Sequence, residues 1–418
     1  MQKFKVWIFL LAIILSSCGG YKTALIWTDR PEFALYGEFF NTVQKQYKVS
    51  IRYIESPRAE LYKIENKTEI PDLVVSSWLK NNQMHITYQS LNNLFGTNKL
   101  SNDSFYPHLL AMGKQEKNQY LLPVSFNIPA LVFSKDSENN YPWFNLSSQF
   151  TIDFEEIQKL SRPYNRSTRN AFTRMGFSPL WNDNFLFTTA VLAGANFREG
   201  NPLRWDPDAL EQSLIYIINW TNEINTNTQL DDDFSYKYFT EPPEKLIENE
   251  RILFMYMESR DLFTFSDERK SNLDFRWIME QDKIPVTEDS VFLGIPKKAK
   301  NKKAARAFID WFYKTESQRQ LLDYLRTYRI NESIFGICGG FSALNNVTEH
   351  IFPLYYPEIL GRRPPSENFS LSNIMPDDWE FIKERFVLPY LHERVRTDNK
   401  EEVNSLERRL SNYVQMTR

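Results

Sequence analysis

Aromatic side chains stand beside charged or amide side chains at several points of the chain, and this combination suits the binding of a polar, ring-shaped solute. Trp27 lies two residues before Asp29 and Arg30, and the run from Tyr256 to Arg260 also joins an aromatic ring to charged groups. Aromatic rings offer a rigid apolar face, whereas carboxylate, amide and guanidinium groups form paired hydrogen bonds. A sugar needs both kinds of contact, because its C–H face packs on a ring and its hydroxyls need polar partners.

Most of the predicted ligand-binding residues lie at or just after the ends of predicted strands. In an open α/β sheet, ligands bind beyond the carboxyl ends of the strands, near the first turns of the following helices. Trp181, Trp205 and Asp183, in the central region of the chain, are weaker candidates. The predicted ligand-binding residues are Trp27, Asp29, Arg30, Ser77, Trp78, Asn127, Trp181, Asp183, Trp205, Tyr256, Glu258, Ser259 and Arg260.

Several candidates also have a purely structural interpretation. The chain contains 32 Phe, 21 Tyr and 10 Trp, so any single Trp can belong to the core. Asp29 can serve only as the N-cap of a helix, and Arg260 can form a surface or interlobe ion pair. The basic run from Lys297 to Lys303 is interpreted as a solvated loop, with a protein-docking surface as the alternative.

Alternating strand and helix patterns position these residues. Residues 23–28 predict a buried strand, apolar residues at helical spacing over 36–47 predict a helix, and residues 49–53 alternate as a strand does. This order predicts an α/β domain with a mainly parallel sheet. The pair Asp206-Pro207 predicts a helix start, with Asp as the N-cap and Pro at the first helical position.

Length and composition favour two lobes. The 418 residues are too many for one ordinary core, and 42% hydrophobic residues fit a folded protein but not a protein with many membrane spans. The formal charge of −3 gives no broad basic surface for nucleic acid. Because no long linker separates the halves, we expect several strands to cross between the lobes.

The first residues predict export and lipid anchoring. Lys3 and Lys5 precede an apolar run, Val6 to Leu15, that is too short to span a bilayer and is typical of a signal peptide. The run ends in Leu15-Ser16-Ser17-Cys18, which resembles a bacterial lipobox. This resemblance implies a signal peptide over residues 1–17 and lipidation of Cys18. The alternative is an ordinary secretory signal with an incidental cysteine.

The remaining residues give no sign of a metal site, a cofactor or a catalytic motif. If Cys18 is lipidated, Cys338 has no disulfide partner, and we expect it to be a buried, inert thiol. The four histidines are scattered without metal-ligand spacing. The chain contains no G-x-S-x-G, H-E-x-x-H or G-x-x-x-x-G-K-[ST] motif. We therefore expect no metal and no cofactor.

The order of these segments resembles the extracellular solute-binding proteins of family 1, which include sugar-binding lipoproteins of ABC importers. The resemblance extends over nearly the whole mature chain as scattered landmarks. It departs from the family at Met257 to Arg260, where members often have Gly and Trp, and at Leu122, where Gly is usual. The landmarks are Ala24–Asp29, Pro71–Val75, Leu122–Lys135, Leu246–Phe254, Val291–Pro296 and Ala304–Ile309.

The resemblance implies a two-lobed, periplasmic-binding-protein-like α/β fold that closes on its solute without catalysis. Lobe one would hold residues 19–132 and 292–328, and lobe two residues 133–291 and 329–418. The implied partners are a small solute, most simply a sugar, the permease subunits of an ABC importer, and the membrane through Cys18. We expect a monomer that binds no nucleic acid.

Two other functions stay open at the level of sequence. A lipid-anchored glycoside hydrolase needs two carboxylates about 5–10 Å apart, and the abundant Asp and Glu residues do not exclude such a pair. A sensor or surface-interaction lipoprotein would use the same lobes without a transporter.

Overall fold

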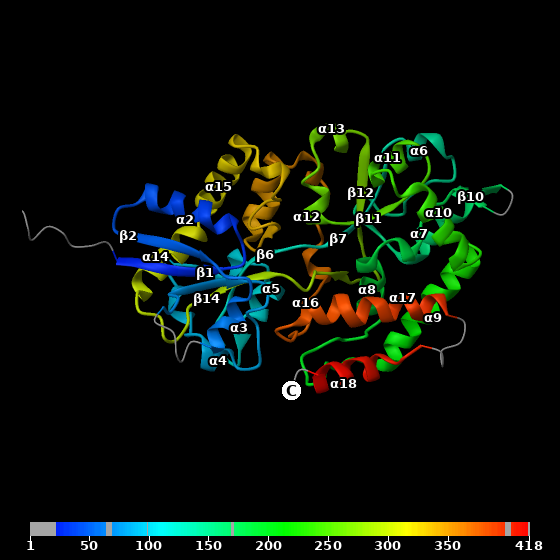
Figure 1. Cartoon of the computed structure of the whole chain (residues 1–418). Coiled ribbons are helices and arrows are strands. Elements are labelled where there is room, and N and C mark those ends of the chain that lie inside the picture. Colours follow the sequence, from blue (N-terminus) through cyan, green and yellow to red (C-terminus); the bar gives the residue numbers. More distant parts are fainter. Residues whose placement is uncertain (1–21, 64–68, 98, 169–170, 398–402, 417–418) are drawn as a thin grey trace, which may run out of the picture.

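The chain forms two α/β lobes that lie side by side (Figure 1). The predicted signal peptide and the predicted lipidation site, Cys18, lie outside the residues that can be described. Within the described part of the chain, no helix is both long enough and apolar enough to cross a membrane. The computed structural model describes residues 22–63, 69–97, 99–168, 171–397 and 403–416.

A six-stranded sheet forms the centre of lobe one. Strand β1, next to the edge strand β2, pairs in parallel with one neighbour on each side, and the other three pairings are antiparallel. In their order across the sheet, the strands are β15 (Phe341–Ser342), β6 (Leu122–Phe126), β14 (Val291–Gly294), β3 (Leu73–Ser76), β1 (Lys22–Thr28) and β2 (Tyr47–Tyr53).

Helix α2 (Glu32–Val43) packs against β2, α14 (Lys302–Phe312) packs against β1 and β2, and the two helices contact each other. Their contact is aromatic: the ring centroids of Phe33 and Phe312 are 5.8 Å apart. The helix predicted over 36–47 ends at Val43, and Tyr47 begins β2 instead. The remaining helices of this lobe are α3 (Pro57–Tyr62), α4 (Met84–Thr87), α5 (Pro107–Met112) and α15 (Thr315–Thr327).

Lobe two has a four-stranded sheet surrounded by most of the helices. Its strands, in order, are β11 (Met255–Glu258), β7 (Pro129–Ser134), β12 (Leu273–Ile278) and β8 (Thr151–Ile152). The helices are α6 (Ser137–Asn140), α7 (Phe154–Tyr164), α8 (Asp183–Leu192), α9 (Pro207–Ile224), α10 (Thr228–Tyr238), α11 (Pro243–Glu248), α12 (Ser259–Leu262), α13 (Asp267–Lys270), α16 (Trp379–Ile382), α17 (Leu388–Arg396) and α18 (Leu406–Met416).

The predicted start of α9 is confirmed in detail. The Asp206 side chain accepts hydrogen bonds from the backbone N–H groups of Asp208 and Ala209, both at 3.1 Å. Pro207 occupies the first helical position, where its missing N–H costs nothing.

The α/β character is confirmed, but the expectation of mainly parallel sheets is wrong, because both sheets are mixed. Parallel neighbours need a crossover connection within the same lobe, as the helix between β1 and β2 provides. Strands β6, β7 and β14 instead adjoin segments that pass between the lobes, and they pair antiparallel with β14, β11 and β3, respectively.

Three segments cross between the lobes. The first joins β6 to β7, the second runs from β13 (Ile284–Pro285) into β14, and the third leads from β15 through β16 (Phe369–Ser370) to α16. Strands β13 and β16 pair with each other, so two of the crossings run together. The prediction placed residues 329–418 in lobe two, whereas β15 joins the lobe-one sheet, where it extends the sheet at β6.

Cys338 lies buried just before β15 as a free thiol, as predicted. Burial raises its pKa well above the ordinary value, so the thiol stays protonated and unreactive at neutral pH.

Candidate functional site

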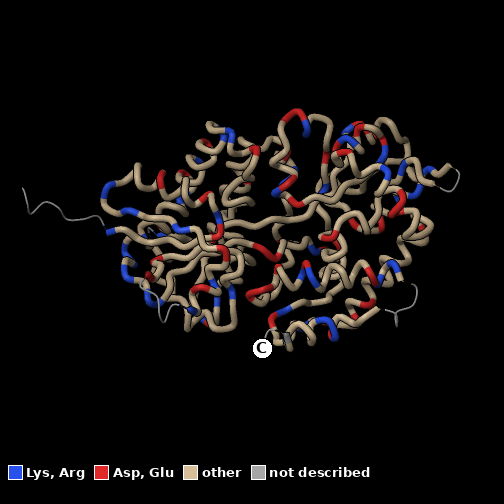
Figure 2. The backbone as a smooth tube through the Cα atoms, viewed as in Figure 1, with Lys and Arg blue, Asp and Glu red and all other residues tan. Residues whose placement is uncertain are grey.

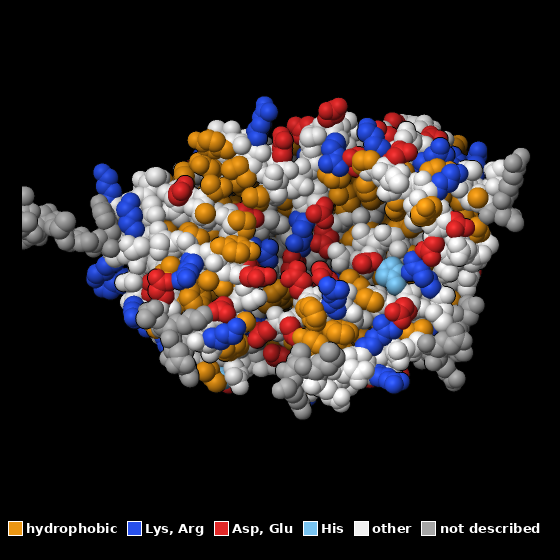
Figure 3. Space-filling view, in the orientation of Figure 1, with side chains coloured by type: hydrophobic (Ala, Val, Ile, Leu, Met, Phe, Trp, Pro, Cys, Tyr) orange, Lys and Arg blue, Asp and Glu red, His pale blue; other side chains and the backbone are white. Residues whose placement is uncertain are grey.

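A cavity of about 530 Å³ lies between the lobes. Figure 3 shows the molecule hollowed near its middle, where acidic side chains gather. Lobe one contributes Trp78, which follows β3, while α8, the end of β11, α12, the second crossing and the α16–α17 region contribute the rest. The lining residues are Trp78, Asp183, Asn184, Glu258, Arg260, Asp261, Thr287, Glu288, Asp289, Trp379, Glu380, Lys383, Glu384 and Leu388.

A second, smaller cavity of about 240 Å³ adjoins the first. Its walls are more aromatic and apolar, and include Phe187, Tyr256 and Val286. The two cavities share five lining residues, all with polar side chains, so they are adjacent to each other along this part of their walls. The shared residues are Asn184, Glu258, Thr287, Glu288 and Lys383.

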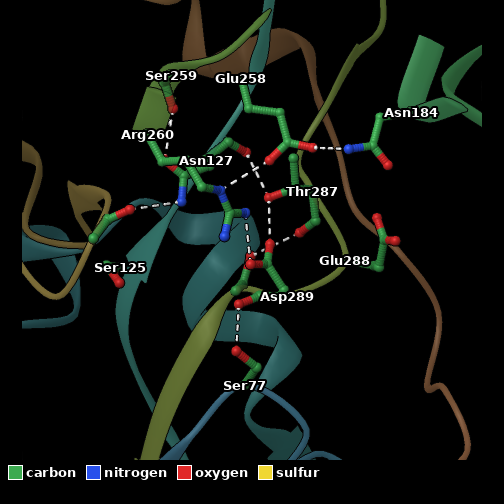
Figure 4. Close-up of polar contacts among 12 residues, drawn as sticks. Ser77, Ser125, Asn127, Asn184, Glu258, Ser259, Arg260, Thr287, Glu288 and Asp289 are labelled. Atoms are coloured by element: carbon green, nitrogen blue, oxygen red, sulfur yellow. Dashed lines mark hydrogen bonds and ion pairs between the residues drawn. The ribbon is translucent and has the colours of Figure 1, made fainter. Parts of the chain in front are cut away.

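The direction of β14 brings Asp289 to the carboxyl end of β3. Because β14 runs antiparallel to β3, with Phe292 opposite Ser76, the residues before β14 lie beside those after β3. The Ser77 hydroxyl donates a 2.7 Å hydrogen bond to the backbone carbonyl of Asp289 (Figure 4). The second crossing is thereby fastened to lobe one at the edge of the cavity.

Arg260 links lobe two to this crossing. Its Nη2 lies 2.6 Å from Oδ2 of Asp289, and its Nε donates to Oε2 of Glu258 at 2.9 Å. The other Glu258 oxygen accepts a 3.1 Å hydrogen bond from Asn184 (Figure 4). Arg260 therefore forms an ion pair, as its structural interpretation required, but its partner across from lobe two is the crossing segment, and Arg260 also lines the cavity.

The pKa values of the two carboxylates that contact Arg260 are shifted in opposite directions. Burial raises the pKa of Glu258 above its ordinary value, and the nearby guanidinium of Arg260 offsets this only in part. For Asp289, burial also acts to raise the pKa, but the charges of Arg260 and Arg30, with hydrogen bonds from Thr287 and Arg260, outweigh burial and lower the pKa. Asp289 is thus the firmly ionised partner of the pair.

Asn127 ties three chain segments together beneath the cavity. Its side-chain amide donates to the backbone carbonyl of Gly339 at 2.9 Å, and its Oδ1 accepts from the Ser259 hydroxyl at 2.7 Å. Its backbone carbonyl accepts from the N–H of Thr287 at 2.9 Å. A Cβ on the neighbouring Gly340 would come within 2.6 Å of the backbone oxygen of Phe126, so glycine is needed for this close approach.

The family of bacterial extracellular solute-binding proteins matches residues 31–319, which is more than half of the chain. The chain belongs to this family. The predicted family is thereby confirmed, and so is the prediction of a solute-binding protein rather than an enzyme. Among curated proteins, no sequence gives a significant match.

Solved structures of solute-binding proteins share the fold of this one at low sequence identity. An ABC substrate-binding protein from Listeria monocytogenes, in complex with cycloalternan, matches with TM-score 0.61 and 15% identity over 94% of this chain and 98% of that one. A cyclic alpha-maltosyl-1,6-maltose binding protein from Arthrobacter globiformis matches with TM-score 0.61 and 11% identity over 96% and 100%. The maltose/maltodextrin-binding domain MalE from Bdellovibrio bacteriovorus, bound to maltotriose, matches with TM-score 0.56 and 10% identity over 94% and 99%. The predicted two-lobed binding-protein fold is confirmed.

In this solute-binding protein, five of the predicted residues line a cavity. Trp78, Asp183, Glu258 and Arg260 line the larger one, and Tyr256 lines the smaller one together with Glu258. Asn127 and Ser259 are buried in the hinge bonds and line neither cavity.

Asp29, Arg30 and Ser77 form a polar cluster behind Asp289. Arg30 Nε lies 3.3 Å from Asp29 Oδ1, and the Arg30 guanidinium donates to the Ser77 hydroxyl. Asp29 accepts from the Ser76 hydroxyl at 2.7 Å and does not cap α2, which begins without a side-chain cap. None of the three residues lines either cavity, so they support the edge of the site from lobe one.

Three predicted Trp residues of the solute-binding protein lie elsewhere. Trp27 is 2% exposed in the core of lobe one. Trp181 stacks on Phe234 at 5.6 Å, and Trp205 packs against the lobe-two core just before α9. A core Trp and a ligand-contacting Trp look alike in a sequence, and neither Trp181 nor Trp205 lines either of the two adjoining cavities.

Sequence reasoning missed the second crossing and the α16–α17 region. Thr287 to Asp289 precede a strand instead of following one, and only the antiparallel direction of β14 reveals their place. Trp379 and Lys383 come from the C-terminal part of the chain and reach the site by tertiary packing, where Lys383 forms an ion pair with Glu288. Within the described residues, no group of three His, Cys, Asp or Glu side chains could hold a metal ion.

Proposed function

We propose that the protein captures a small polar solute, a carbohydrate, between its lobes and delivers it to an ABC importer. The observation that carries this proposal is the composition of the interlobe cavity. Trp78 enters it from lobe one, and Asp183, Asn184 and Glu258 enter it from lobe two. A solute that contacts both sets of residues favours the arrangement in which the lobes enclose it, and this coupling drives closure.

A carbohydrate fits the chemistry of the cavity walls. The half-buried Trp78 presents aromatic surface for the C–H face of a sugar ring, and carboxylate and amide oxygens accept hydrogen bonds from hydroxyls. The combined volume of the two cavities, about 530 and 240 Å³, is in the usual range for small-ligand sites. The sugars in the three similar structures support the same class of solute.

Export and anchoring complete the proposal. The segment over residues 1–17 and the lipobox cysteine Cys18 support a lipoprotein that works outside the cytoplasm, as the family does. Several acyl chains on Cys18 would hold the protein stably at a bacterial membrane. The permease subunits of the importer are the proposed protein partner, and the binding protein acts as a monomer.

Thermal unfolding in the presence of a solute panel tests the binding function. A solute that binds only the folded state raises Tm by mass action, so a mono- or oligosaccharide should raise Tm where amino acids do not. Trp78→Ala should abolish the shift or weaken binding at least tenfold, because it removes the aromatic wall. Trp205→Ala is the matched control, since Trp205 is also half-buried but lines neither cavity. A sugar that is consumed during the experiment, or a Trp78→Ala protein that binds normally, would contradict the proposal.

A further inference from the structure

The interlobe cavity is strongly acidic compared with the rest of the molecule. Seven carboxylates and two basic side chains line it, a formal surplus of five negative charges. The whole chain has a formal charge of only −3, so the residues outside the cavity are on balance slightly positive. Figure 2 shows acidic positions gathered around the space between the lobes. The carboxylates are those of Asp183, Glu258, Asp261, Glu288, Asp289, Glu380 and Glu384.

Both basic groups of the cavity are already occupied by carboxylates. Arg260 binds Glu258 and Asp289, and Lys383 forms an ion pair with Glu288. An anionic solute would have to break one of these pairs, which leaves a half-buried carboxylate without its partner. The cavity therefore disfavours the binding of an anionic solute.

Three of the carboxylates have no counterion of their own. The carboxylates of Asp261, Glu380 and Glu384 make no hydrogen bond or ion pair with any residue in the described part of the chain. Glu380 and Glu384 lie on the lobe-two side, and Asp261 lies in the short helix that follows β11. The negative charge of these three carboxylates attracts a cationic group of any solute in the cavity. A cleft with low-dielectric walls focuses this electric field.

The cavity also offers surfaces that a simple cation would not use. The half-buried Trp78 provides aromatic surface, and the nearly buried Trp379 and Leu388, with Phe187 and Tyr256 in the adjoining smaller cavity, form apolar parts of the walls. A solute that fills this space has an apolar ring face as well as polar edges. A protonated amine on such a ring would find carboxylates on several sides.

We propose that the solute is a cationic saccharide, an amino sugar or an oligosaccharide that carries free protonated amines. This inference rests on the proposed function, because it specifies the solute of the same interlobe cavity. The amine interacts with the carboxylates that lack counterions, and a ring face packs on Trp78. Closure of the lobes removes water from the cavity and strengthens this attraction.

Calorimetric titration with matched probes tests the inference. The probes are the trimer of glucosamine, its fully N-acetylated form, maltotriose and trigalacturonate, all on the full-length protein in detergent. We expect the glucosamine trimer to bind at least tenfold more tightly than the acetylated and neutral trimers, and trigalacturonate not to bind. Raising NaCl from 20 to 500 mM should weaken the glucosamine trimer about tenfold and affect a neutral trimer little, because salt screens exposed charges.

Two double variants distinguish the effect of the cavity's negative charge from an effect on the fold. Glu380→Gln with Glu384→Gln should weaken the glucosamine trimer about five- to tenfold, since both side chains are exposed and their loss leaves the fold intact. Glu155→Gln with Glu367→Gln, two exposed carboxylates that line neither cavity, should leave the affinity unchanged.

The possible outcomes distinguish this inference from the proposed function. Equal or tighter binding of a neutral or acetylated trimer overturns the cationic solute and keeps carbohydrate capture. Spermidine, an amine without a sugar ring, is titrated as a fifth probe, and if it binds while no saccharide does, both proposals are overturned. The absence of any binding also overturns both.

Discussion

Asp231 shows how one buried carboxylate ties lobe two together. It lies in α10, where its Oδ2 accepts hydrogen bonds from the Ser178 hydroxyl at 2.5 Å and from the Asn225 amide at 3.4 Å. Its other oxygen is buried and has no hydrogen-bond partner among the described residues. Burial raises the pKa of Asp231 to about 8, although both hydrogen bonds act to lower it. The neutral acid is therefore the form that the fold prefers.

Asp231 should make the protein less stable as the pH rises from about 4 to about 8. In this window the folded state keeps a proton that the unfolded chain, with an Asp pKa of about 3.9, has already released. The free energy of unfolding must then fall with rising pH. Asp231→Asn removes the titrating group, so urea unfolding at pH 5, 6, 7 and 8 should show a smaller fall than in the parent protein.

The control for this prediction lies on the same helix. Asp233→Asn changes an exposed carboxylate of α10 and should keep the parent pH dependence. If Asp231→Asn and Asp233→Asn behave alike, Asp231 is not the group responsible.

At the scale of elements, Asp72 joins the strands of lobe one to α14. It is 2% exposed and accepts four hydrogen bonds. Oδ1 accepts from the backbone N–H groups of Lys300 and Asn301 at 2.8 and 2.6 Å, and Oδ2 accepts from the backbone of Leu25 at 3.0 Å and the side chain of Asn301 at 3.1 Å. The start of β3 is thereby held to β1 and to the turn before α14, in the middle of the basic run Lys297–Lys303.

Asp72→Ala should lower the free energy of unfolding by about 3 kcal/mol, because it leaves several buried donors without an acceptor. Urea unfolding followed by tryptophan fluorescence measures the change. Asp103→Ala, at an exposed carboxylate of the same lobe, should stay within about 0.5 kcal/mol of the parent protein. A loss at Asp72 as small as that at Asp103 would show that the turn before α14 is held by other contacts.

At the scale of the whole molecule, the angle between the lobes depends on the hinge bonds of Asn127. Gly339, Ser259 and Thr287 belong to three separate parts of the chain, and each is bonded to Asn127. Two of these bonds use the side chain, so a truncation at this position loosens the hinge without removing a cavity residue.

Asn127→Ala should broaden the distribution of lobe orientations in the absence of solute. Spin labels at two exposed positions, Tyr53 in lobe one and Tyr236 in lobe two, would report it as a wider distance distribution. Ser259→Ala removes one of the two side-chain bonds and should give an intermediate width. If Asn127→Ala has the same width as the parent protein, the paired strands of the crossings, and not Asn127, set the lobe orientation.

The fold could be predicted in outline because its signals are local. The apolar runs that became β1, β3, β7 and β14 are short and contiguous, and Asp206-Pro207 marks a helix start through backbone chemistry that needs no partner. The family resemblance rests on the order of these same segments, and residues 31–319 confirm it. The mixed strand directions were missed, because an apolar run does not reveal which way its neighbour runs.

The site could be predicted only where a residue at the end of a strand, or just after it, also lines the interlobe cavity. Trp78, Glu258 and Arg260 meet both conditions, whereas Trp27 lies within β1 and is buried in the core.

By itself, the sequence determined the two-lobed α/β class, the family, and the kind of side chains available for a solute. Only the tertiary structure decided which of these side chains meet. The antiparallel β14 brings Asp289 to the end of β3, and the C-terminal helices bring Trp379 and Lys383 to the same cavity. The physical reason is that a binding cavity is formed by packing between segments hundreds of residues apart, and residue type and local period do not encode that packing.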